Sequence, residues 1–104
     1  MAQLPSSVFK RWLHSREEDA TGLSIYRPAE YPFPPSRGRP GFEIHPDGVF
    51  VGISIGRADG LRGRRGRWRL ESDDRLHIEY DDGGAETLTI RSVDDDVLRV
   101  ESAR

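Results

Sequence analysis

The chain has 104 residues, which suits one domain spanning residues 1–104, because two separate cores would each be too small to be stable. Hydrophobic residues make up 35% and charged residues 33%, so the core must be thin, with one apolar face on each element and water on the other. The lack of cysteine excludes disulfides, thiolate zinc sites and a cysteine nucleophile, and the net charge of −2 excludes a general attraction to nucleic acid or anionic lipid.

The N-terminal part predicts a short helical turn followed by two strands. A serine at position 6 or 7 can cap one helical turn that leads to Trp12. Residues 13–19 then fit a strand rich in charge, and residues 23–27 fit a more regular strand. The turn-forming residues 20–22 join these two strands as a hairpin.

A segment rich in proline and arginine follows at residues 27–40, and we name it the Pro-Arg segment. Proline lacks the amide donor that a central strand needs, so this segment is expected to be an extended crossing loop. Its aromatic residues, Tyr31 and Phe33, lie between prolines, and a free linker would leave their apolar surface in water. We therefore expect an ordered segment that closes one end of the fold.

From residue 41 onward, apolar and polar residues alternate between turn residues, which predicts successive antiparallel strands. Residues 42–45 and 49–55 form a hairpin through a turn that contains Pro46 and Gly48. One face of the second strand carries four branched residues, Val49, Val51, Ile53 and Ile55. Residues 56–66 are polar and rich in glycine, which predicts a loop.

The remaining strands follow at short spacing, at residues 67–71, 76–80, 87–91 and 98–101. In the first of them Trp68 alternates with Arg67 and Arg69, which places the indole on the core side. About eight strands with short connections bury a core without free edges most simply as a small antiparallel up-and-down barrel. The fold class is therefore expected to be all-β, with an open twisted sheet and a small sandwich as the alternatives.

The strand at residues 41–44 with its Asp47-Gly48 turn, the run Gly66-Arg67-Trp68 and the closing strands resemble the small lipocalin-like domains of bacteria. Features nearer the N-terminus resemble a narrower subgroup of hypothetical proteins: Trp12, Glu17, Glu18 and residues 26–28 and 34–39. The resemblance covers most of the chain and implies a lipocalin-like barrel with Trp12 in its core. Its motifs are turn glycines and core tryptophans, so it implies no activity. Lipocalins are longer and hold small apolar ligands, whereas the shorter strands here predict a small interior.

Six arginines flank the glycine-rich stretch: Arg57, Arg62, Arg64, Arg65, Arg67 and Arg69. Such a cluster could follow a phosphate backbone, but the aromatic support is thin because Trp68 is needed in the core. The acidic turns would also oppose binding of a polyanion. We interpret the cluster as a solvated loop and expect no nucleic-acid partner.

The residue types needed for metal binding or catalysis are scattered. His14, His45 and His77 fall on three separate elements, so neither a metal site nor a cofactor is expected. Ser36 and Ser54 lack a base at usable spacing, so the sequence predicts no catalytic residue and a protein that is not an enzyme. No stretch reaches the roughly twenty apolar residues of a membrane helix, so we expect a cytoplasmic protein without membrane contact.

The function that we expect is the binding of a small apolar or amphipathic ligand at one barrel end. The candidate ligand-binding residues are Tyr31, Phe33, Arg37 and Arg39. The guanidinium groups suit a ligand carboxylate. The structural alternative pairs these arginines with Glu17, Glu18 or Asp59, and the two aromatic rings then plug the barrel end. The functional alternative is a protein-interaction module that uses the Pro-Arg segment or a strand edge.

Overall fold

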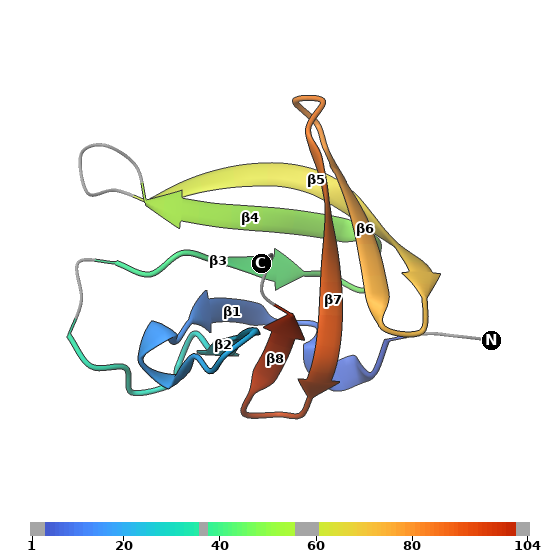
Figure 1. Cartoon of the computed structure of the whole chain (residues 1–104). Helices are drawn as coiled ribbons and strands as arrows, with labels where there is room; N and C mark the ends of the chain where they lie inside the picture. The colour runs from blue at the N-terminus through green and yellow to red at the C-terminus, as the bar shows by residue number, and fades with distance from the viewer. Residues whose placement is uncertain (1–3, 36–37, 56–60, 102–104) are drawn as a thin grey trace.

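The computed structural model describes residues 4–35, 38–55 and 61–101, with the side chains at 55, 61 and 62 excepted. Its strands are β1 (Arg11–His14), β2 (Leu23–Pro28), β3 (Gly41–Ile44), β4 (Val49–Ile55), β5 (Leu61–Ser72), β6 (Arg75–Tyr80), β7 (Ala85–Val93) and β8 (Leu98–Glu101). Two 3₁₀ turns, η1 (Ser6–Val8) and η2 (Arg16–Glu18), lie on opposite sides of the molecule (Figure 1). No helix within the described ranges is long and apolar enough to cross a membrane.

The eight strands form a closed antiparallel barrel in the order β1-β2-β8-β7-β6-β5-β4-β3. Strands that follow one another in sequence are neighbours, except that β2 and β3 lie on either side of β1 and the Pro-Arg segment connects them. The prediction of an all-β up-and-down barrel is confirmed, and the closed order excludes the open sheet and the sandwich.

The N-terminal elements differ from the prediction in one respect. The helical turn is present as η1, but the first strand is Arg11–His14, and the charged residues after it form η2 in place of a strand. The expected strand at residues 13–19 is therefore wrong beyond His14. The sequence Arg16–Glu18 has no apolar alternation to bury, so it turns over the outside of β2 instead.

The prediction of a loop at residues 56–66 is also wrong for its second half, because β5 begins at Leu61 and its residues 61–67 pair with the whole of β4. Residues 56–60 lie outside the described part of the chain. In β5, Gly66 marks a place where the backbone approaches the neighbouring strand β6 closely. A Cβ atom at Gly66 would lie 2.4 Å from the carbonyl oxygen of Glu79 on β6, so no larger residue fits without a shift.

One end of the barrel is closed by apolar side chains. The largest fully buried side chain, Trp12, donates its indole N–H to the Val8 carbonyl of η1 at 2.9 Å. We name this region the closed end, formed by Leu4, Val8, Trp12, Leu76 and Leu98, each of which is buried. The core position that the resemblance implied for Trp12 is confirmed.

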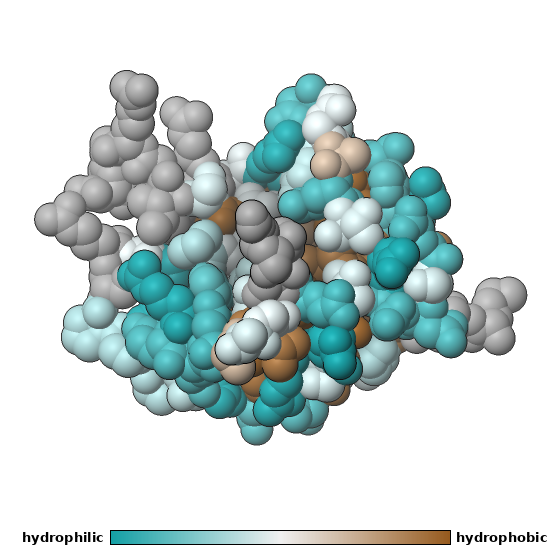
Figure 2. Space-filling model, in the orientation of Figure 1, coloured by the Kyte–Doolittle hydropathy of each residue, from teal (hydrophilic) through white to brown (hydrophobic). Residues whose placement is uncertain are grey.

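The second tryptophan lies less deeply. Trp68 faces the interior and packs against the core, as the alternation predicted, but it is only half-buried. Its ring stacks on Phe9 at 6.1 Å between centroids, and its N–H donates to the His45 carbonyl at 2.8 Å. Much of the visible outer surface is hydrophilic, with apolar atoms in small areas between (Figure 2).

Candidate functional site

The opposite end of the barrel is hollowed and polar. It is formed by the C-terminal ends of β1, β4, β6 and β8 and the N-terminal ends of β2, β3, β5 and β7, because neighbouring strands are antiparallel. A cavity of about 240 Å³ opens there, and we name it the polar mouth. Its lining residues are Gly41, Gly52, Ile53, Ser54, Arg64, Tyr80 and Glu86.

A row of aromatic rings crosses the barrel interior below this end. We name it the aromatic row, and its members in order are His14, Tyr26, Phe42, Phe50 and Tyr80. The distances between successive ring centroids are 5.1, 4.7, 5.5 and 6.0 Å. Rings at these separations pack favourably and present both faces and edges to a neighbour. The barrel therefore contains a buried aromatic cluster that continues to the polar mouth through Tyr80.

Polar groups of the mouth are held in a fixed arrangement around Tyr80. Its hydroxyl donates to a carboxylate oxygen of Glu86. The guanidinium of Arg64 lies over the Tyr80 ring at 3.9 Å and forms a two-point ion pair with Asp82, at 2.7 and 2.9 Å. Gly52 makes room for the phenol, because a Cβ atom there would lie 3.2 Å from the Tyr80 hydroxyl.

These contacts determine the protonation states at neutral pH. Burial and the hydrogen bond to Glu86 raise the pKa of Tyr80, so its hydroxyl stays a proton donor. The hydrogen bonds from Arg64 lower the pKa of Asp82 from 3.8 to about 2, so this pair stays charged. Burial, with the Asp19 and Glu86 carboxylates, also raises the pKa of Tyr26. The mouth thus offers neutral phenols, one carboxylate and a neutralised guanidinium.

Three of the four sequence-predicted site residues can be located, and they lie away from this cavity. Arg39 is 6% exposed and binds both carboxylate oxygens of Glu17, at 2.8 and 2.7 Å, with further bonds to the His14 and Pro34 carbonyls. Its guanidinium also lies over the Phe33 ring at 4.6 Å. The predicted pairing with Glu17 is confirmed. Arg37 lies outside the described residues.

The aromatic residues of the Pro-Arg segment contact each other and the arginines. The rings of Tyr31 and Phe33 meet edge to face at 4.9 Å, and Arg27 lies over Tyr31 at 4.7 Å. Neither ring belongs to the hydrophobic core or to the residues packed against it. The expectation that they plug the barrel is therefore wrong. Arg27 alternates with the core-facing Tyr26, so the segment packs on the outer side of the barrel.

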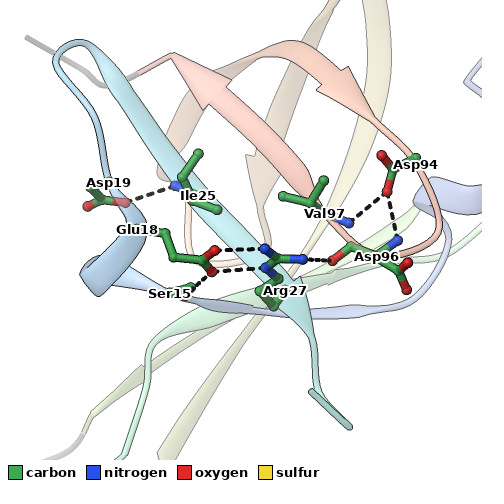
Figure 3. A network of polar contacts seen from close by, with 8 residues as sticks. All are labelled: Ser15, Glu18, Asp19, Ile25, Arg27, Asp94, Asp96 and Val97. Atoms are coloured by element: carbon green, nitrogen blue, oxygen red, sulfur yellow. Dashed lines mark hydrogen bonds and ion pairs between the residues drawn. The ribbon is translucent and has the colours of Figure 1, made fainter. Parts of the chain in front are cut away.

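A polar network fixes η2 to the outer side of β2 (Figure 3). Glu18 accepts two hydrogen bonds from Arg27, at 2.9 and 2.7 Å, and one from the Ser15 hydroxyl at 2.6 Å. Arg27 also donates to the Asp96 carbonyl at 3.1 Å, which ties η2 to the turn before β8. The Arg27 guanidinium lowers the pKa of Glu18 from 4.5 to about 2. All three nitrogen atoms of the Arg27 guanidinium donate hydrogen bonds in this network, so we interpret it as a structural connection between η2, β2 and the turn before β8.

The other candidates remain separate. Each histidine contacts carboxylates of its own neighbourhood, and within the described ranges no three metal-binding side chains gather. Ser54 lines the polar mouth, yet no described base lies within hydrogen-bonding distance of it. The exposed arginines Arg65, Arg67 and Arg69 lie on β5 and not in a loop. A second cavity, of about 270 Å³, lies between the last two of these and is also lined by Trp68, His77 and Glu79.

Sequence reasoning missed the polar mouth. The sequence did carry one indication of this site: some residues that alternate with the outward-facing positions of their strands, and therefore face the interior, are polar. Glu86 shares the inner face of β7 with Leu88, and Arg64 shares that of β5 with Trp68.

Comparisons of this chain with protein-family models, with curated proteins and with solved structures found no match. The chain is thus a small eight-stranded antiparallel barrel with a buried aromatic cluster. Its function has to be inferred from the geometry of its own residues.

Proposed function

We propose that the protein is a lipocalin-like binding module, without catalytic activity, that holds a small amphipathic molecule in the polar mouth. The observation that carries the proposal is the pairing of an aromatic floor with a few fixed polar groups at one barrel end. Binding pockets combine apolar and aromatic walls with a small number of placed polar groups in this way, and barrel mouths are a usual location. The cavity of about 240 Å³ is smaller than those that hold drug-sized molecules, so the ligand must be small.

The proposal moves the binding site from the Pro-Arg segment to the polar mouth. Arg39 already donates hydrogen bonds to Glu17 and to two carbonyls, so it has little capacity left for a ligand carboxylate. Tyr31 and Phe33 are likewise engaged by Arg27 and Arg39. The closed barrel also speaks against the strand-edge version of a protein-interaction module, because none of the described strands has a free edge.

The test is a titration of the protein with benzyl alcohol, a neutral probe with one ring and one hydroxyl, followed by two-dimensional NMR. We expect amide shifts to concentrate at Gly52, Ser54 and Glu86. Gly52→Val should fill the cavity and reduce binding at least tenfold. Gly63→Val is the matched control on the neighbouring strand, because a Cβ atom at Gly63 meets only Val51, at an ordinary 3.6 Å.

Two results would contradict the proposal. Shifts centred on residues 27–35 and 38–40 would return the site to the Pro-Arg segment. Equal loss of binding in the Gly52 and Gly63 variants would show that filling the cavity is not the cause.

A further inference from the structure

We infer that the polar mouth selects an organic cation, such as a primary ammonium attached to a small ring or chain. The inference rests on the proposed function and names the class of ligand. It follows from the balance of charge at the mouth, the free hydrogen-bonding capacity there, and the aromatic surfaces that border it.

The charges that face the mouth leave one carboxylate unmatched. Arg64 is the basic residue of the cavity lining, and Asp82 neutralises it through two hydrogen bonds. Glu86 accepts a hydrogen bond from Tyr80 and forms no ion pair among the described residues, although it lies near enough to Arg64 to raise the pKa of that guanidinium slightly further than Asp82 does alone. His14, at the far side of the same end, lies against Asp19 at 2.9 Å. A cation that enters the mouth therefore meets the Glu86 carboxylate, which has no ion-pair partner in the described part of the chain. An anion meets only the Arg64 guanidinium, which is already paired with Asp82.

The hydrogen-bonding groups of the mouth also suit a cation. An ionised carboxylate has about four acceptor positions, and Tyr80 occupies one of those on Glu86. The Tyr26 hydroxyl has no hydrogen-bond partner among the described residues, and its oxygen can accept from an ammonium. Tyr26 is not among the cavity-lining residues, but burial raises its pKa and the Asp19 and Glu86 carboxylates raise it further, which places both carboxylates near its hydroxyl.

The aromatic surfaces provide the third argument. Cations bind over the faces of tyrosine and phenylalanine rings within about 6 Å of the centroid. Arg64 lies in this way over Tyr80 at 3.9 Å, so a cation of the protein itself already uses one ring face at the mouth. Tyr26 packs against Phe42 in a tilted arrangement, with 4.7 Å between the ring centroids, and extends the same kind of surface toward β2.

Three probes of equal ring size separate the charge preference from binding itself: benzylamine, benzyl alcohol and benzoate. NMR titration of the intact chain should give benzylamine an affinity at least fivefold higher than that of benzyl alcohol, with benzoate weakest. Glu86→Gln keeps an acceptor for Tyr80 and removes the charge, so it should reduce benzylamine affinity about tenfold and leave benzyl alcohol nearly unchanged. Glu79→Gln makes the same charge change on the outer side of β6, where it should leave all three affinities unchanged.

A second variant should shift the preference of the polar mouth from cations toward anions. Asp82→Asn releases Arg64 from its ion pair, so benzoate affinity should rise and benzylamine affinity should fall. This variant does not alter Glu86, so it tests the charge balance even if Glu86→Gln perturbs the fold.

The outcomes separate the two claims. Benzoate binding as tightly as benzylamine, or a preference that Glu86→Gln does not reduce, overturns the cation inference while benzyl alcohol binding keeps the proposed function. Failure of all three probes to shift the amides of the polar mouth overturns both.

Discussion

The two ends of this barrel are built from the same eight strands with the same alternation, yet the inward positions carry opposite chemistry. At the closed end, η1 brings Val8 against Trp12, and both are fully buried. At the polar mouth, the inward positions carry Arg64, Tyr80 and Glu86, which bind one another and Asp82. Apolar burial stabilises a fold more reliably than exposed ion pairs do. We therefore expect most of the stability to come from the closed end, whereas the proposed binding site lies at the other end, where the polar groups contribute less to the fold.

The largest effect is expected at the closed end. Trp12→Ala removes a fully buried indole and its hydrogen bond to Val8, so it should lower the free energy of unfolding by about 3 to 5 kcal/mol. Trp68→Ala should cost less, because that ring is only half-buried. Urea denaturation followed by circular dichroism measures both. Equal costs would show that the core is not concentrated at the closed end.

Two glycine variants compare a position that packs against the backbone of a neighbouring strand with a position that packs against a side chain of the polar mouth. Gly66→Ala places a methyl group 2.4 Å from the Glu79 carbonyl oxygen, a backbone atom, so it should cost about 1 to 3 kcal/mol. Gly52→Ala meets the Tyr80 hydroxyl at 3.2 Å, and that side chain can move, so the cost should be under about 1 kcal/mol. It should instead weaken probe binding, because Tyr80 must leave Glu86. A large stability loss at Gly52 would mean that the mouth is packed as rigidly as the strands.

The Pro-Arg segment provides a test of where the ligand binds. Arg39→Leu removes the hydrogen bonds from a buried guanidinium to the half-exposed Glu17 and to two backbone carbonyls, so it should lower stability by about 1 to 3 kcal/mol, with probe binding at the mouth unchanged. Arg91→Leu is the control, because its pair with Glu101 is exposed on both sides and should contribute under about 0.5 kcal/mol. Thermal melts and the benzyl alcohol titration report the two properties separately. Weakened binding without a stability loss in Arg39→Leu would make the segment the site.

The fold was predictable from the sequence because alternating apolar residues and turn signals are local. The start of β5 was not, because glycine and arginine before Gly66 are typical of loops, and only pairing with β4 makes them a strand. Charge narrowed the partner of Arg39 to three carboxylates, Glu17, Glu18 and Asp59, but only the structure shows that Glu17 binds it. The polar mouth was not predictable, because it depends on the pairing register of β5, β6 and β7, which brings Glu86 to Tyr80 and Arg64 to Asp82. Such contacts join residues whose spacing carries no motif.

The last and smallest expected effect is a difference in acid sensitivity between the two ends. The carboxylates with strongly lowered pKa values lie in η2 and in the turn between β6 and β7, both on the side of the polar mouth. Hydrogen bonds from Arg39 lower the pKa of Glu17 from 4.5 to about 2, and those from Arg64 do the same for Asp82 from 3.8. A carboxylate with a lowered pKa in the folded state stabilises the fold above its unfolded pKa. That contribution disappears as the pH falls through the folded value.

Acidification from pH 5 to about 2 should therefore loosen η2 and the turn at residues 81–84, while the five apolar side chains of the closed end, which carry no carboxylate, stay packed. Asp94, in the turn before Leu98, also has a lowered pKa because the Asp96 and Val97 amides donate to it, so the backbone of that turn should respond to acid as well. NMR spectra across this range should show the Glu17 and Asp82 amides moving while the methyl groups of Val8 and Leu98 keep their native shifts. Glu17→Gln is the informative variant, because it should be less stable than the unmodified chain at pH 7 and equally stable near pH 2. A stability difference that persists unchanged at pH 2 would mean that Glu17 acts through packing and not through its charge. Loss of the Leu98 signal before that of Asp82 would reverse the order of the two ends.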